Sequence, residues 1–182
     1  MISKKSGVRR TAGICWLALV LGALVVVAPA HVPTASGAVP HVDTSTSWTV
    51  YHGNALGTGA DLSGVTFSPP NHAWTSPVLD GQVYGEPLEA TGRVYVATEN
   101  DTIYALAANT GAVLWSRHVG TPVPSGDLPC GDISPTVGIT GTPVLDVGRG
   151  EIFAVADTLA GGVPAHVLVG LNMYSGASLM ST

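Results

Sequence analysis

Residues Gly92–Trp115 read GRVYVATENDTIYALAANTGAVLW, and this stretch decides the fold. It holds three short apolar runs: the first at 94–97, the second at 103–106 and the third from Val113. Asn, Asp, Thr and Gly separate the runs, and these residues favour turns because they bond locally to the backbone or accept positive φ. Strands joined by turns this short must be antiparallel neighbours, since a parallel pair needs a crossover of roughly a dozen residues or more. The stretch predicts a three-stranded meander.

The composition favours an all-β fold for the body of the chain. Of 182 residues, 46% are hydrophobic and only 10% are charged, which is ample material for a core. The 23 glycines and 13 prolines suit many short strands and turns. No stretch of the body carries sustained helical periodicity.

Residues 1–30 have the layout of a secretory signal peptide. Four cations precede an uninterrupted apolar run, 12–28, and small residues then supply a cleavage site after residue 30, or alternatively after residue 38. An uncleaved membrane anchor is the alternative, because the run is nearly long enough to span a bilayer. The sequence therefore predicts an exported protein (secreted, periplasmic or at the cell surface) that contacts a membrane only through an uncleaved leader.

Removal of the leader leaves a strongly acidic chain. Three arginines then stand against twelve acidic residues, a net charge of −9, with no lysine. A surface this negative repels nucleic acid. Cys130 is the single cysteine left, so it stays free, pairs with another chain or pairs with sequence outside this chain.

The meander resembles the repeat of a known family. Ala105-Leu106, then Asn109-Thr110-Gly111, then Trp115 four residues after the glycine, is similar to the tryptophan-docking repeat of the PQQ-like (quinoprotein-type) β-propellers. Ala107 departs from the pattern, which has an acidic residue there. The resemblance implies a partial propeller built from four-stranded antiparallel blades. It also implies that each tryptophan docks its blade over a turn of the neighbouring blade.

The rest of the chain repeats this pattern. The predicted propeller covers 48–182 after a flexible lead-in, 31–47, with one blade at about 85–119 and a second at 141–182. We expect an N-terminal strand at 73–78 that completes a third blade, whose other strands would lie outside this chain. The residues that the resemblance places at blade contacts are Trp74, Gly111, Trp115, Gly176 and Met180, where Met180 replaces the tryptophan. Because propellers close with typically about four to eight blades, we expect a truncated product or fragment of a longer protein.

The opening segment, 48–54, resembles the start of PQQ-like propellers, with its Trp, Tyr, His and Gly. We interpret it as an aromatic clasp that holds the N-terminus on the propeller. The alternative is that His52 binds a ligand.

Two links between strands are enlarged, at 119–140 and 157–166, and strand alternation places both on one face of the propeller. Long loops on a rigid scaffold are where function concentrates. Asp127, Cys130 and Asp132 are the candidate binding residues of the first link. They fall short of a metal-ligand set. The Glu99–Asp101 segment is interpreted as a turn, with calcium binding as the alternative.

Three functions remain open. The first is a non-catalytic binding or assembly scaffold for a protein or small-molecule ligand, without a cofactor; no nucleophile elbow, zinc motif or phosphate loop indicates an enzyme. The second is a fragment of a quinoprotein dehydrogenase, which the resemblance implies would hold PQQ and calcium and need further blades. The third is a chain inactive alone, which self-associates through open blade edges.

Overall fold

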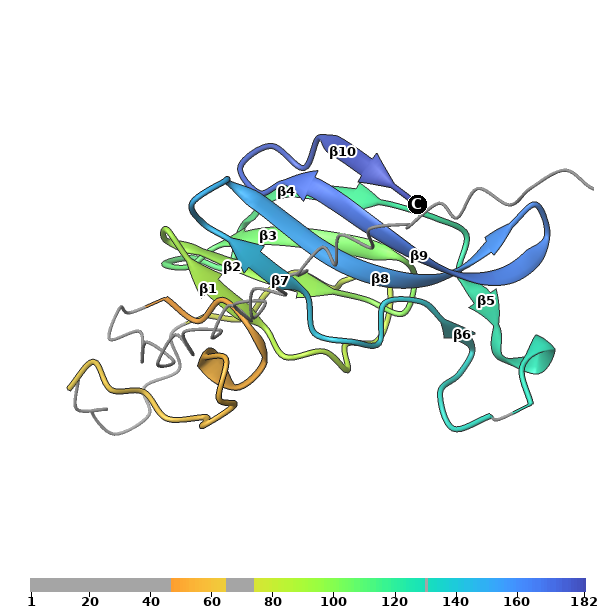
Figure 1. The fold of residues 1–182 in the computed structure, drawn as a ribbon, viewed down its shortest axis with the longest axis horizontal. Helices are drawn as coiled ribbons and strands as arrows, with labels where there is room; N and C mark the ends of the chain where they lie inside the picture. The colour runs from red at the N-terminus through yellow and green to blue at the C-terminus, as the bar shows by residue number, and fades with distance from the viewer. Residues whose placement is uncertain (1–46, 65–73, 130) are drawn as a thin grey trace, which may run out of the picture. The chain divides into compact units, whose positions relative to one another are not determined.

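Two four-stranded antiparallel sheets follow one another along the chain (Figure 1). The computed structural model describes residues 47–64, 74–129 and 131–182, which belong to one unit of the chain, Ala38–Thr182. The predicted leader lies outside the described residues, as does nearly all of the lead-in. Within the described residues, no helix is long and apolar enough to cross a membrane.

The first sheet is the predicted meander with one inner strand added. Its strands lie in sequence order and are β1 (Leu88–Ala90), β2 (Arg93–Ala97), β3 (Thr102–Ala107) and β4 (Val113–His118). Tyr95 pairs with Ala105, and Ala105 pairs with Trp115. The register shifts at Leu106, which pairs with Val113, so that β4 carries one extra residue, Leu114. This bulge keeps Trp115 on the same side of the sheet as Tyr95.

The second sheet repeats the order with longer central strands. Its strands are β7 (Val144–Asp146), β8 (Glu151–Ala160), β9 (Val163–Asn172) and β10 (Ser178–Ser181). The prediction of a loop at 157–166 is wrong, because β8 and β9 stay paired through this range. Gly161 and Gly162 form the turn between them with φ of 62° and 84°. Two residues of positive φ match the twist of a hairpin, so the strands can run to the turn.

The inner strands begin later than the sequence predicted. The two blades are predicted to begin at about residues 85 and 141, but β1 starts at Leu88 and β7 at Val144. In both copies the strand begins just after a proline. Proline has no N–H to give to the ladder, so the paired region starts beyond it.

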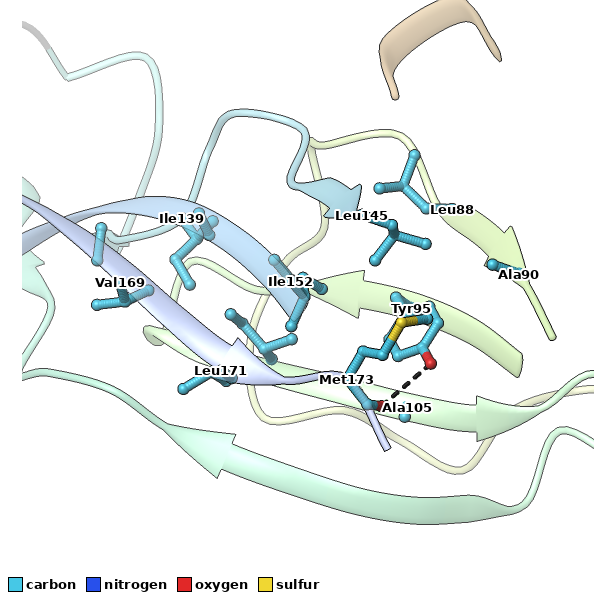
Figure 2. Packing of buried hydrophobic residues seen from close by; sticks show 14 residues of the cluster. Leu88, Ala90, Tyr95, Ala105, Ile139, Leu145, Ile152, Val169, Leu171 and Met173 are labelled. Carbon is cyan, nitrogen blue, oxygen red and sulfur yellow. Dashed lines mark hydrogen bonds between the residues drawn. The ribbon is translucent and has the colours of Figure 1, made fainter. Parts of the chain in front are cut away.

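The hydrophobic core lies between the two sheets (Figure 2). Its large members from the first sheet are Leu88, Tyr95 and Ile103, and those from the second sheet and its last turn are Leu145, Ile152, Leu171 and Met173. Tyr95 is fully buried, and its hydroxyl donates to the Met173 carbonyl at 3.1 Å. Ile152, Ala154 and Ala156 of β8 face this core. Since side chains alternate along a strand, the residues between them face the other way.

The opening segment joins the inner strands of both sheets. Trp48 exchanges two backbone hydrogen bonds with Glu89 of β1, at 2.7 and 2.9 Å. The next carbonyl, of Thr49, accepts from the Leu145 N–H of β7 at 2.9 Å. The short 3-10 turn η1 (Tyr51–Gly53) follows, and within it the ring of His52 stacks on Tyr51 with centroids 3.9 Å apart. The segment thus ties the two sheets together at their inner edge.

Candidate functional site

The enlarged link between the sheets, which we call the linker (residues 119–143), has structure of its own. It contains β5 (Val123–Pro124), the 3-10 turn η2 (Ser125–Asp127) and β6 (Thr136–Val137). β5 and β6 pair antiparallel, and the Ser125 N–H donates to the Pro135 carbonyl at 3.0 Å. The linker is therefore a small hairpin with a connecting tip, which we define as residues 126–133.

The linker covers the edge of β8 that β7 leaves unpaired. β7 pairs with only the first three residues of β8. Farther along, the Leu159 N–H donates to the Thr121 carbonyl at 2.8 Å and the Asp157 N–H to the Gly138 carbonyl at 3.0 Å. The Thr158 hydroxyl also donates to the Thr121 carbonyl, at 2.8 Å. These bonds satisfy groups that an open strand edge would expose, and they bring together the two links that the sequence singled out.

The candidate binding residues lie on the tip of the linker. Asp127 ends η2, Asp132 follows it, and both side chains are exposed. Cys130 lies outside the described residues. Across the described parts of the chain, no group of three or more His, Cys, Asp or Glu residues is placed to hold a metal ion.

The turn between β2 and β3 holds both ends of the linker. We call this segment, Thr98–Asp101, the acidic turn. Its Asp101 carbonyl accepts from the Val119 N–H at 2.8 Å, and its Thr98 carbonyl accepts from the Ile139 N–H at 3.2 Å. The Thr136 hydroxyl donates to the Glu99 carbonyl at 2.9 Å. A single turn of the first sheet therefore fixes the beginning and the end of the linker.

Two carboxylates of the acidic turn are buried. Glu99 is 2% exposed, and its Oε2 accepts from the Gly138 N–H at 2.7 Å and from the Thr140 hydroxyl at 3.0 Å. Asp101 is fully buried with a positive φ of 54°. Burial raises the pKa of Asp101 to about 6; the Thr158 hydroxyl and His118 act against this rise, and Asp157 and Glu99 add to it.

A third acid, Asp80, lies beside the acidic turn, and its pKa shifts in the opposite direction to that of Asp101. The exposed carboxylate of Asp80 accepts hydrogen bonds from the hydroxyls of Thr102 at 2.6 Å and Thr98 at 2.9 Å, and from the Asn100 amide at 3.0 Å. Partial burial works against the charged form, but these hydrogen bonds hold the pKa of Asp80 below its ordinary value. Asp80 thus fastens the preceding segment to the acidic turn as an anion.

Trp115 of the first sheet lies over a turn of the second. Its indole N–H donates to the Met173 carbonyl at 3.1 Å. The ring covers Gly176 so closely that a Cβ on this glycine would lie 2.7 Å from it. Arg117, on the same strand, donates to the Gly176 carbonyl at 2.7 Å. The structure thus brings together two of the residues that the resemblance placed at a blade contact.

Trp74 and Gly111 repeat this arrangement earlier in the chain. The Trp74 indole N–H donates to the Ala108 carbonyl at 2.8 Å, and its ring lies directly over Gly111. In both copies the accepting carbonyl comes three residues before the covered glycine. Met180 differs, because its side chain lies over Gly170 of its own sheet and is 38% exposed.

A comparison with family models decides the identity of the repeat. Residues 35–177 match the family model PQQ_2, described as "Outer membrane protein assembly factor BamB". The chain belongs to this family. The predicted PQQ-like family is therefore confirmed, as is the all-β fold of four-stranded antiparallel propeller blades.

Two solved structures are similar to this BamB-family chain, and both are far larger. BamB from Moraxella catarrhalis shares 14% identity with a TM-score of 0.41 over 60% of this chain. A europium-containing methanol dehydrogenase shares 20% identity with a TM-score of 0.40 over 53%. The chain spans 27% and 14% of the length of these two proteins. A search of curated proteins finds no match.

The sequence did not predict the buried carboxylates of this BamB-family chain. Glu99 and Asp101 were interpreted as ordinary turn residues, because acidic residues are usually exposed. The groups that bury them come from the linker: Gly138 and Thr140 donate to Glu99, and Gly120 and Gly138 lie against Asp101. No local pattern carries that information.

Proposed function

We propose that this chain is an exported, non-catalytic scaffold of the BamB family that holds another protein, and that the tip of the linker contacts this partner. The supporting observation is that the linker is fixed on both sides while Asp127 and Asp132 of its tip are exposed. The acidic turn holds its ends and β8 holds its flanks. A supported tip loses little conformational entropy when it binds.

The family description supports assembly as the kind of function. It names an outer membrane protein assembly factor, and the predicted leader would export the chain to a compartment where such proteins are handled. No cofactor is part of this proposal. A quinoprotein fragment is the alternative, in which PQQ and calcium would bind.

Shortening the tip should weaken partner binding. Replacing residues 126–133 with Asn-Gly retains the pairing of Pro124 with Thr136 and removes Asp127 and Asp132. We expect the affinity for a labelled outer-membrane protein, diluted from urea, to fall about tenfold or more. Fluorescence anisotropy measures this affinity.

The double variant Asp127→Asn and Asp132→Asn is the matched control, because it keeps the tip and removes only its charge. An affinity that stays unchanged in the shortened variant contradicts the role of the tip. Failure of the folded wild-type chain to bind any such protein, together with saturable binding of PQQ and calcium, favours the quinoprotein alternative.

The outward face of the second sheet supports self-association of the isolated chain. The apolar side chains on this face, with their exposed fractions, are Val144 (45%), Val155 (50%), Leu168 (39%) and Met180 (38%). They lie opposite the core: Val155 pairs with Leu168, and Val144 and Met180 pair with Phe153 and Gly170, which pair with each other. We propose that a second copy covers this face when the chain stands alone, as one sheet covers the other in the core.

Placing charges on this face should keep the chain monomeric. Val155 and Leu168 are paired, so Val155→Lys with Leu168→Glu introduces opposite charges that attract each other. We expect the dimer dissociation constant to rise about tenfold or more, as measured by light scattering over a concentration series. Val78→Lys is the control, because Val78 is 100% exposed and lies outside the second sheet. It should leave the dimer dissociation constant unchanged. Equal association of all three proteins contradicts the proposed face.

A further inference from the structure

The acidic turn carries three carboxylate oxygens that the described residues leave without a hydrogen-bond partner. They are both oxygens of Asp101 and Oε1 of Glu99, and all three are inaccessible to solvent. The Thr158 hydroxyl lies beside Asp101 but donates its hydrogen to the Thr121 carbonyl. A buried carboxylate without donors is costly while it is charged and much less costly when it is protonated.

The linker closes tightly over Asp101. A Cβ on Gly138 would lie 2.8 Å from one Asp101 oxygen, and a Cβ on Gly120 would lie 3.1 Å from the other. Both glycines belong to the linker, one near each of the ends that the acidic turn holds. Any loosening of the linker would therefore admit water to this carboxylate.

The charges that face Asp101 do not neutralise it. Glu99 of the same turn and Asp157 of β8 are acidic, and the one basic group is the exposed His118 of β4, whose Nδ1 lies 3.1 Å from the Thr102 hydroxyl. The arginines of the described residues are engaged elsewhere: Arg93 lies over Tyr174, Arg117 donates to Gly176 and Arg149 pairs with Asp146. Lysine is absent from the described ranges.

We propose that Asp101 is a proton-operated latch on the linker. In its protonated form the acidic turn stays buried under Gly120 and Gly138. In its ionised form the buried charge favours opening, which hydrates the carboxylate and loosens the two ends of the linker from the acidic turn. The described arginines lie elsewhere and no lysine is present in the described ranges, so the counter-charge that we propose for Asp101 is a proton.

The direction of the pH effect follows from the pKa values. Asp101 has a pKa of about 6 when buried and 3.8 ordinarily. The closed state therefore binds the proton more tightly than the open state. Protonation of Asp101 stabilises the closed state most below pH 4. This stabilisation decreases progressively as the pH rises to 6, and above that pH the closing equilibrium no longer changes.

Amide hydrogen exchange of the mature chain tests the latch. We expect the opening equilibrium at the amides of Val119, Gly138 and Ile139 to rise about 30-fold from pH 4.5 to pH 8, after correction for intrinsic exchange rates. In Asp101→Asn this rise should disappear, because an amide does not titrate and asparagine accepts the positive φ. Asp127→Asn, on the exposed tip, should respond like the wild type.

Three results would overturn the latch. One is a wild-type response shared equally by Ile152 and Leu171 of the core, which indicates global rather than local opening. Another is recovery of protection by calcium at pH 8, which indicates a metal rather than a proton as the counter-charge. If Asp101→Asn does not fold, NMR titration of the Asp101 carboxyl carbon in the wild type decides: a midpoint near 6 supports the latch and a midpoint near 4 overturns it.

Discussion

Replacing Trp115 with alanine should lower the free energy of unfolding by about 3–5 kcal/mol, the range for deletion of a large aromatic side chain from a core. The ring packs against the core, lies 6.2 Å from Tyr95 between ring centroids and covers Gly176. Its removal leaves a cavity between the two sheets, and the Met173 carbonyl loses one of its hydrogen-bond donors. Urea unfolding followed by circular dichroism measures the loss.

Trp115→Phe separates packing from hydrogen bonding at this site. Phenylalanine keeps an aromatic ring over Gly176 but has no N–H for the Met173 carbonyl, which still accepts from Tyr95. We expect a loss of about 1 kcal/mol. If Trp115→Ala costs well under 1 kcal/mol, the tryptophan is a surface residue and the docking account is wrong.

Gly176→Ala should cost about 2–5 kcal/mol. Gly176 has a φ of 69°, and a non-glycine residue in this left-handed region costs about 1–2 kcal/mol. In addition, the new Cβ would lie 2.7 Å from the Trp115 ring, and overpacking adds about 1–3 kcal/mol. Thermal or urea unfolding of the two proteins gives the difference.

Gly92→Ala is the matched control for this substitution. Gly92 has nearly the same φ, 73°, but a Cβ on it would meet nothing within 4 Å. It should therefore cost only the backbone strain, about 1–2 kcal/mol. Equal losses for Gly92→Ala and Gly176→Ala would show that no ring covers Gly176.

Local patterns were sufficient to predict the strands of the two four-stranded sheets and their antiparallel order, but the strand predicted at 73–78 is wrong, because residues 74–78 form no strand. Turn residues closed each apolar run, and the spacing from Gly111 to Trp115 identified the repeat. The sequence pattern places the beginnings of the two blades too early, at about Gly85 and Gly141. The prolines that follow them delay the ladder, a rule that the sequence already contained.

The β8–β9 hairpin and the buried acids show two different limits of prediction from the sequence. The Gly161–Gly162 pair is a signal for a two-residue turn, but the sequence pattern predicts an enlarged link at 157–166, and β8 and β9 pair through this range instead. The burial of Glu99 and Asp101 depends on the linker folding back over the acidic turn. That contact is tertiary, so the pattern of neighbouring residues could not indicate it.

The most direct test of docking between successive sheets is an NMR measurement of contacts between the indole protons of Trp74 and Trp115 and the Hα protons of the glycine that each covers, in the folded chain. We expect nuclear Overhauser contacts from Trp115 to Gly176 and from Trp74 to Gly111, with the glycine Hα resonances shifted by the ring current. Folded protein that shows neither contact would contradict the docking of successive sheets through these tryptophans.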